Sequence, residues 1–340
     1  MQKLRKDNHY VPKLYLKQWA CNGQIPTYRL LVPNSNYPLW KDYSIKGIAF
    51  HRHLYTYVAD HGETDEFERW LDREFESPAE EAISRAINEQ KLSPQHWHQL
   101  IRFLAAQDVR TPVRLREFIE RQKKQMQPLI NDTLTSSIEN LENATRSGFR
   151  LPESDKKNNG LYPFKVTVVR SPDGGGTIQA ETVIGRRLWL TSSRHALTST
   201  ISHLMTHRWT IVRAPDGITW PTSDNPVIRL NFLDPDNYDF FGGWGRQNGN
   251  ILLPLSPKHL MLTQIGSRSY PRGKTLDYQM ARLVRRMLIQ HADRYIFAKE
   301  EGDIHLIRPR KVCNAAYQRE QTAWRSWHGE QSKAETDLLS

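Results

Sequence analysis

The chain has 340 residues, 38% of them hydrophobic and 25% charged, which is typical of a globular protein with one large domain or two closely packed ones. Its two cysteines, Cys21 and Cys313, exclude a disulfide framework and a cysteine-based zinc site. The formal charge of +11 favours acidic partners, either nucleic acid or a phosphorylated substrate, although the same charge also serves solubility.

The sequence indicates a cytoplasmic protein that has no membrane partner. No apolar run is long enough to cross a bilayer. The first seven residues lead into polar sequence and not into the apolar core of a signal peptide.

A short run from Asn8 to Trp19 is the most unusual stretch near the N-terminus, because it combines a polar pair, a proline and several large apolar side chains. Chain ends usually fray, and these side chains would be costly to leave in water. We therefore expect the run to be buried, with Asn8 and His9 at its rim. Extended backbone before Pro12 and a short helix ending near Gly23 follow from the sequence. Residues 27–58 read as short strands and turns.

Helices dominate the next part of the chain, from about 63 to 148. Apolar residues recur at helical spacing, and Ser77 and Ser93, each followed by proline, are expected to cap new helices. Pro112 ends or kinks the third helix, and a long amphipathic helix follows, with Gly148 as its stop. Residues 152–161 are polar and read as a linker or loop.

Strand patterns become frequent after this loop. Strands are expected at 164–169, 209–212, 251–255, 260–263 and 295–298. Helices are expected at 186–207 and 276–291, and a loop at 233–250. The polar tail after Arg310 is expected to be loosely ordered.

The order of these elements predicts an α+β fold, because helices and strands do not alternate as they do in βαβ units. We expect one domain over residues 5–300, in which a helix-rich N-terminal half (about 63–148) packs with a mostly antiparallel sheet from the C-terminal half (about 162–300). Residues 301–340 are expected to be a C-terminal extension. Gly174, Gly175 and Gly176 lie in a hairpin turn and do not form a phosphate-binding loop.

The first candidate site is the run from His9 to Pro12, which superficially matches the opening histidine of HNH nucleases. That module also needs an asparagine and a second histidine within a short ββα unit. Asn22 is acceptable, but the next histidine is His51, beyond strand and turn sequence. A capping histidine or one at the rim of the core is the other reading, and the residues favour it.

The second candidate lies at 222–227, where Asp224 and Asn225 precede a proline. An aspartate in such a turn can bind a metal, orient a base or hold a histidine. Alternatively, both side chains bond neighbouring amides in an Asx-turn.

The third candidate contains Gln107, Arg110 and Arg114 at a helix break, where a guanidinium can reach a phosphate or pair with a buried carboxylate. Two further patterns are weaker. His203 and His207 are spaced to chelate a metal on one helix face, and Arg282, Arg285 and Arg286 form a basic patch that can be solvated surface or a phosphate contact.

Three motifs together resemble those of domain-of-unknown-function family 4238, the bacterial "HYVP" family: Asn8 to Leu16, Gln107 to Pro112, and Thr222 to Pro226. Residues 254–257 and the segment leading to 292–294 resemble its closing segments. Trp19 stands where a phenylalanine is expected, a departure that concerns packing. Members of the family include stand-alone anti-phage defence proteins, so the resemblance implies a biological setting and brings no catalytic residue with it.

The leading hypothesis is an anti-phage effector that binds nucleic acid and cuts or modifies it, as a metal-dependent or histidine-based nuclease. In this reading His9 is a general base or metal ligand, Asp224 orients it or binds a divalent metal, and Arg110 steadies a phosphate. Asn8, Gln107, Asn225 and Arg114 would contact the substrate. The reading requires the motifs to meet in one pocket open to water.

Two other readings stay open. The protein can be a non-enzymatic sensor of a phage protein that acts through a partner or by oligomerising, with the segment 233–250 as its recognition surface. It can also be a toxin that acts on a nucleotide or a small metabolite, since its positive charge suits any phosphorylated substrate.

Overall fold

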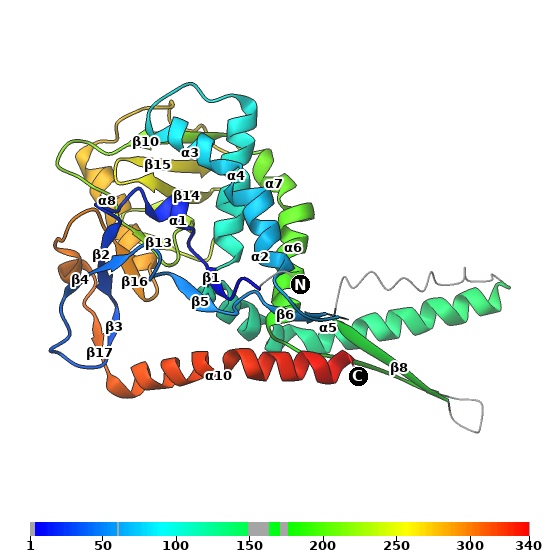
Figure 1. The fold of residues 1–340 in the computed structure, drawn as a ribbon. Coiled ribbons are helices and arrows are strands. Elements are labelled where there is room, and N and C mark those ends of the chain that lie inside the picture. Colours follow the sequence, from blue (N-terminus) through cyan, green and yellow to red (C-terminus); the bar gives the residue numbers. More distant parts are fainter. Residues whose placement is uncertain (1–3, 60, 149–162, 171–175, 340) are drawn as a thin grey trace.

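The computed structural model describes residues 4–59, 61–148, 163–170 and 176–339. A five-stranded antiparallel sheet lies in the upper left part of the body in Figure 1. Its strands, in spatial order, are β10 (Trp209–Arg213), β15 (His259–Gln264), β14 (Gly249–Ser256), β12 (Ile228–Asp234) and β13 (Asn237–Asp239).

Both faces of this sheet are covered by helices. Along β14, Ile251 and Leu253 belong to the main core, whereas Leu252 belongs to a second core on the opposite face. The apolar run at 251–255 is uninterrupted because this strand is buried on both faces and therefore has no polar side. The helices of the main core include α1 (Lys13–Leu16), α3 (Ala79–Ile87), α4 (Pro94–Val109) and α6 (Arg186–His195). The helix on the opposite face is α8 (Tyr278–His291).

Of the two helix caps expected from the sequence, Ser93 is confirmed and Ser77 is not. Ser93 caps α4, and His96 completes the capping box with it. Thr111 caps α5 (Pro112–Arg146), with Pro112 in the first turn. The expectation that Ser77 caps a helix is wrong. Ser77 has helical backbone angles, because α2 (Glu66–Leu71) continues through the π-helical turn η1 (Asp72–Glu76) toward α3.

A second, four-stranded sheet contains strands from the N-terminal and the C-terminal parts of the chain. Its order is β11 (Thr222–Ser223), β16 (Tyr295–Phe297), β2 (Gln24–Arg29) and β4 (Trp40–Ser44). The α+β class is therefore confirmed, but the expected division into a helical first half and a sheet-rich second half is wrong. Strands from the N-terminal fifty residues pair with strands from beyond residue 220, so helices and sheets interleave.

The remaining strands form two-stranded pairs. They are β1 (Asp7–His9) with β5 (Phe50–Arg52), β6 (Tyr57–Ala59) with β7 (Gly62–Thr64), β3 (Leu31–Val32) with β17 (Lys311–Val312), and β8 (Phe164–Arg170) with β9 (Gly176–Thr182). The β3–β17 pair is parallel. The predicted loop at 152–161 lies outside the described residues.

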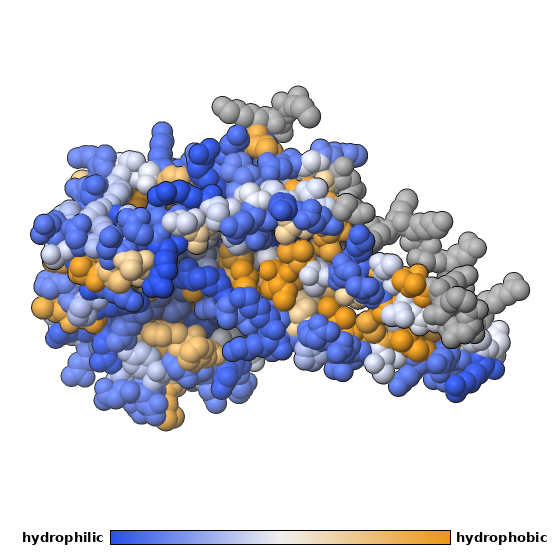
Figure 2. Space-filling view, turned by 90° about the horizontal axis from the view of Figure 1, so that it is seen from below, coloured by the Kyte–Doolittle hydropathy of each residue, from blue (hydrophilic) through white to orange (hydrophobic). Residues whose placement is uncertain are grey.

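The second half of α5 and the β8–β9 hairpin project from the body on the same side (Figure 1). Several apolar side chains on this arm are exposed, namely Leu129, Ile138, Leu141, Val166, Val168 and Val169. Seen from below, apolar side chains also gather in the middle of the face and continue toward the arm (Figure 2). The arm therefore presents apolar surface to the solvent.

The expectation of a loosely ordered tail after Arg310 is also wrong. A short helix, α9 (Ile304–Ile307), precedes it, and residues 314–339 form the long helix α10 (Asn314–Leu339), which lies along the base of the molecule (Figure 1). Glu335 of α10 is buried and pairs with the buried Arg186 at 2.7 Å. No helix in the described part of the chain is both long and apolar enough to cross a bilayer.

Candidate functional site

The three sequence motifs lie against one another in the folded chain. The Arg110 Nη2 group donates to the carbonyl of His9 at 2.6 Å, which joins the first and second motifs. Thr111 Oγ1 donates to Asn225 Oδ1 at 3.4 Å, which joins the second and third. Polar residues that are far apart in the sequence therefore lie in one region of the fold, as residues that share a role are expected to do.

His9 lies at the rim of the buried N-terminal run, as expected. Its ring leans on Phe50, with 5.4 Å between ring centroids. Burial, followed by the charge of Lys13, lowers the pKa of His9 to about 4, so the imidazole is neutral at pH 7. Its Nε2 atom is buried, and no group in the described chain accepts from it or donates to it.

Arg110 is sealed from solvent and held by protein groups. Besides the His9 carbonyl, it bonds Glu76 on η1 and the Tyr55 hydroxyl, and Glu68 on α2 lies 3.8 Å from it. The guanidinium is 1% exposed. Of the two readings that the sequence offers for Arg110, this geometry matches the pairing with buried carboxylates.

Asn8 and Gln107 are both fully buried. Asn8 Oδ1 accepts from the Tyr55 backbone N–H at 3.0 Å, and Asn8 Nδ2 donates to the Arg5 carbonyl at 3.0 Å, so Asn8 connects the N-terminus to the turn before β6. Neither polar atom of the Gln107 side chain has a hydrogen-bond partner in the described chain. Buried polar groups are normally bonded, so Gln107 is an exception for which the contacts give no structural reason.

Asp224 binds backbone and faces away from water. Its carboxylate accepts the N–H groups of Asp293 at 2.9 Å and Arg294 at 2.8 Å, which fixes the start of β16. Burial, together with the nearby Asp293 carboxylate, raises the pKa of Asp224 to about 7. The bonds reach amides some seventy residues away, so the local Asx-turn is not formed by this side chain.

Asn225 is paired with His291, the last residue of α8. The His291 Nδ1 group lies 3.0 Å from the Asn225 carbonyl, and the Asn225 Nδ2 group faces the same ring. Burial and the charge of Arg114 lower the pKa of His291 to about 3, so this ring is neutral as well. A neutral imidazole beside a carbonyl donates through Nδ1.

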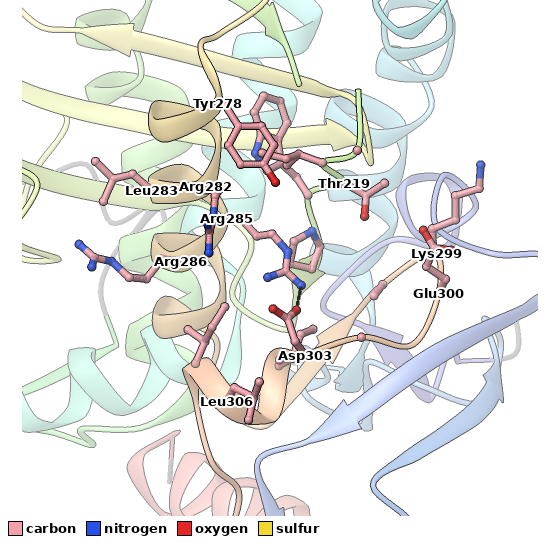
Figure 3. Close-up of a pocket in the computed structure, with 18 of the residues that line it drawn as sticks. Thr219, Tyr278, Arg282, Leu283, Arg285, Arg286, Lys299, Glu300, Asp303 and Leu306 are labelled. Atoms are coloured by element: carbon pink, nitrogen blue, oxygen red, sulfur yellow. Dashed lines mark hydrogen bonds and ion pairs between the residues drawn. The ribbon is translucent and has the colours of Figure 1, made fainter. Parts of the chain in front are cut away.

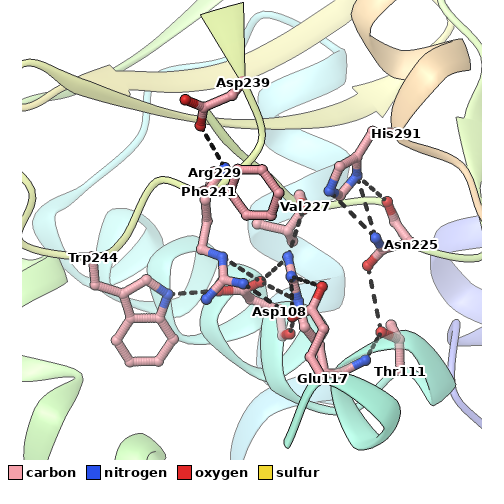
Figure 4. A network of polar contacts seen from close by, with 11 residues as sticks. Asp108, Thr111, Glu117, Asn225, Val227, Arg229, Asp239, Phe241, Trp244 and His291 are labelled. Atoms are coloured by element: carbon pink, nitrogen blue, oxygen red, sulfur yellow. Dashed lines mark hydrogen bonds and ion pairs between the residues drawn. The ribbon is translucent and has the colours of Figure 1, made fainter. Parts of the chain in front are cut away.

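Next to this pair, Asp108 and Glu117 form a network with two guanidiniums, those of Arg114 and Arg229 (Figure 4). Arg114 pairs with Asp108 at 2.8 Å and with Glu117 at 2.8 Å. Arg229 of β12 approaches the same two carboxylates at 3.6 and 3.4 Å. The Trp244 indole donates to Asp108 at 2.7 Å. Burial would raise the pKa of Asp108, but Arg229, Arg114 and the indole hold it below its ordinary value, so Asp108 is ionised.

This network forms one wall of a cavity of about 350 Å³ between α5, α6 and β12, which we call the arginine cleft. Arg114, Arg121 and Arg229 line it. Its other lining residues are Asp108, Val109, Glu117, Phe118, Trp189, Ser192, Ser193, Ala196, Thr200 and Trp244. The cleft thus combines three arginines with two carboxylates, aromatic rings and hydroxyls. Guanidiniums can bind phosphate, and aromatic rings can stack on a base.

One of the three guanidiniums has binding capacity left. Arg121 is exposed and leans on Phe118, and no ion pair to it occurs in the described chain. The Arg229 Nε group is buried 3.6 Å from Asp108 Oδ1, so it faces that carboxylate and not the cleft. The two carboxylates neutralise Arg114 and Arg229, so Arg121 is the net positive charge of the cleft.

Of the seven residues predicted for the site, only Arg114 lines this cavity. Arg110 and Asp224 are buried in the adjoining scaffold, with Asn8, Gln107 and Asn225, and His9 is at its edge. The catalytic roles of His9, Arg110 and Asp224 stay predictions, and the observed contacts of Arg110 and Asp224 are those of residues that position the backbone.

Sequence reasoning missed Asp108, Glu117, Arg121, Arg229 and Trp244. Asp108 carried a signal, because it follows Gln107 inside the second motif and precedes a helix break. Arg229 and Trp244 carried none, since nothing in the sequence brings β12 and the following loop to α5.

The described residues include one group of side chains that could hold a metal ion: His53, Glu63 and His328. The two imidazole rings are stacked in parallel, 3.8 Å apart, so their nitrogen lone pairs do not converge on one ion unless a ring turns. Arg186 donates to His328 Nδ1, which leaves the ring proton on Nε2 facing Glu63 at 3.0 Å. A hydrogen-bonded cluster fits these contacts better than a metal site does.

Among the histidines of the other patterns, His207 and His51 have partners elsewhere. His207 Nε2 lies 2.5 Å from the Trp244 carbonyl, so it donates there. His51 stacks on Trp324 of α10 at 3.7 Å and on Tyr10 at 5.4 Å. Asn22 has a left-handed conformation in an exposed turn, and β1 pairs with β5 without a following helix, so no HNH-like ββα unit forms here.

Comparison with known proteins gives one match. The model of the family described as "Protein of unknown function (DUF4238)" matches residues 7–302. No curated protein and no solved structure matches the chain.

Proposed function

The chain belongs to the DUF4238 family, and from that premise and the geometry of its site we propose that it is a bacterial anti-phage effector that binds nucleic acid in the arginine cleft and cuts or modifies it. The observation that carries the proposal is the cleft itself. Three arginines line one open cavity beside two tryptophans, and one of them, Arg121, is exposed and has no ion pair in the described chain. The defence setting rests on the resemblance of the three motifs.

The buried network supports this role by holding the arginines in place. Asp108 is anchored by Arg114, Arg229 and Trp244, so the guanidiniums point into the cleft without having to be ordered when a ligand arrives. Preorganised donors cost less conformational entropy on binding. The polar motif residues behind the cleft then act as scaffold for it.

Arg121→Ala tests the proposal with little risk to the fold, because Arg121 is exposed. We expect binding of labelled single-stranded RNA or DNA, followed by fluorescence anisotropy, to weaken about tenfold. Lys124→Ala is the matched control, since it removes the same charge from an exposed position of the same helix outside the cleft. Equal affinities of the two variants, or no binding by the wild-type protein, would contradict the proposal.

The chemical step needs its own assay. Purified protein is incubated with RNA and DNA, with and without Mg²⁺ or Mn²⁺, and the products are separated on a gel. Cleavage that is lost in His9→Ala, with an unchanged melting temperature, supports the catalytic role predicted for His9. Cleavage that persists in this variant rejects that role.

A specific observation also favours the sensor reading as a second candidate. In the segment 233–250, Leu233 is 76% exposed and Phe241 is 82% exposed. Large apolar side chains that are this exposed are typical of protein-binding surfaces. If the sensor reading is right, a phage protein will bind the wild-type chain, and Leu233→Ser with Phe241→Ser will abolish this binding while nucleic-acid affinity stays unchanged.

A further inference from the structure

A second cavity, of about 420 Å³, opens where the segment after α7 (Ser202–Met205) meets the end of β15. It is lined by Thr206, His207, Arg208, Gln264, Ile265, Gly266, Ser267 and Arg268. Arg208 and Arg268 are both exposed, and neither has an ion pair in the described chain. No carboxylate is among the lining residues, so the field in this cavity favours an anion.

A larger cavity, of about 870 Å³ along α8, differs in this respect (Figure 3). The basic patch predicted from the sequence lies there, but acidic side chains balance it. Its charged lining residues are Arg282, Arg285, Arg286, Lys299, Asp236, Glu300, Glu301 and Asp303. Arg285 already pairs with Asp303 at 2.6 Å. The smaller cavity with Arg208 and Arg268 is therefore the stronger anion site.

The walls of this second cavity are fixed by hydrogen bonds. The Arg208 carbonyl accepts the hydroxyls of Thr263 at 2.9 Å and Ser269 at 2.6 Å, which leaves the Arg208 side chain free above an anchored backbone. Gly266 has φ +80°, a backbone conformation that favours glycine, and the end of the Gln247 side chain lies beside it.

One segment separates the second cavity from the arginine cleft. Trp244 lines the cleft, and its carbonyl accepts from His207, which lines the second cavity. Gln247, three residues further along, packs against Gly266 of the second cavity. Arg246 lies between them and is exposed. The arginine cleft and the second cavity thus share a wall formed by residues 244–247. Trp244 lies on the cleft side of this wall, and Arg246 is exposed along it.

We propose that Arg208 and Arg268 form a second phosphate subsite, which binds another phosphate of the same single-stranded nucleic acid that occupies the arginine cleft. The inference rests on the proposed function and adds the class of substrate. A flexible single strand can place successive phosphates in two hollows on either side of residues 244–247, whereas a rigid duplex cannot enter cavities of this size. The Trp244 ring gives one base a stacking surface between them.

The test compares short and long strands. Labelled oligouridylates of roughly 4 and roughly 16 nucleotides are bound to the wild-type protein and to Arg208→Ala/Arg268→Ala. We expect the double variant to bind the long strand about tenfold more weakly than the wild type does. Its affinity for the short strand, which fits within the arginine cleft, should be unchanged. The control is Arg325→Ala/Lys333→Ala, which removes two charges from exposed positions of α10.

Each other outcome is decisive. A double variant that behaves like the control overturns the second subsite, as does an equal loss for both strand lengths. In those cases the proposed function stands if Arg121→Ala still weakens binding. Absence of binding by the wild-type protein overturns the proposed function and this inference together.

Discussion

A buried guanidinium needs acceptors for five N–H donors, and Arg110 finds them on three separate elements. Its partners are the His9 carbonyl, the Tyr55 hydroxyl and Glu76, with Glu68 nearby. One cation therefore faces two carboxylates whose side chains are only 13% and 15% exposed. Burial raises the pKa of Glu68 to about 8, with Glu76 adding to the effect and Arg110 opposing it. Glu68 is thus protonated in the folded protein at neutral pH.

This assignment predicts how stability depends on pH. Between pH 4.5 and about 8 the folded state keeps a proton on Glu68 that the unfolded state has released, so Glu68 lowers the free energy of unfolding as pH rises, by up to about 1.4 kcal/mol per pH unit. Glu68→Gln removes this titratable group, so residue 68 no longer contributes to the pH dependence of stability. We expect this variant to match the wild type near pH 5 and to exceed its stability near pH 8, as measured by urea denaturation.

Glu76→Gln is the informative control for Glu68→Gln, because it removes the carboxylate that bonds Arg110 directly. Loss of that partner is expected to destabilise the protein at both pH values. If Glu68→Gln instead costs stability at pH 8, Glu68 is ionised in the folded state and the pairing with Arg110 is stronger than its geometry indicates.

Among the elements, α10 is a helix whose polar sequence does not indicate how it packs against the body of the protein. Its apolar residues are scattered, so no helical stripe predicts a buried face. The helix is held instead by a buried ion pair, Arg186 with Glu335, and by the Glu335 bond to the Val58 N–H at 2.9 Å. His51 stacking on Trp324 adds an aromatic contact.

Breaking that ion pair is expected to release the helix. Glu335→Gln keeps the side-chain shape but leaves the Arg186 charge buried without its partner, which costs about 3–5 kcal/mol. Amide hydrogen exchange over residues 314–339 should rise steeply in this variant. Glu330→Gln, on the exposed side of the same helix, should leave exchange unchanged. Equal exchange in the two variants would show that other contacts hold α10 in place.

Most helices and strands of the body were predictable because their signals are local. Ser93 with Pro94 marks the start of α4, and the apolar run at 251–255 marks β14. The pairing of β2 with β16 and the docking of α10 were not predictable, since they depend on contacts between distant residues. The same holds for the site. The motifs indicated that Arg114 and Asn225 belong together, but no local pattern points to Arg229 or Trp244.

At the scale of the whole molecule, the proposed nucleic-acid binding is expected to be sensitive to salt because the protein carries an excess of positive charge. Each phosphate that the protein neutralises on a single strand contributes about −0.7 to the slope of log affinity against log salt concentration. Arg121→Ala should reduce the magnitude of this slope by about 0.7, whereas Lys124→Ala should leave it unchanged. A slope that is the same in both variants would indicate that Arg121 does not contact phosphate.

The pairing of β2 with β16 also constrains how the chain is made. Thr27 pairs with Phe297, and the indole of Trp19 donates to the carbonyl of Trp220. A ribosome that adds about 5–20 residues per second needs roughly a quarter of a minute to a minute to reach the partner strand. During that time the nascent N-terminus lacks the strand that pairs with it, so the first segment to be synthesised is among the last to become native.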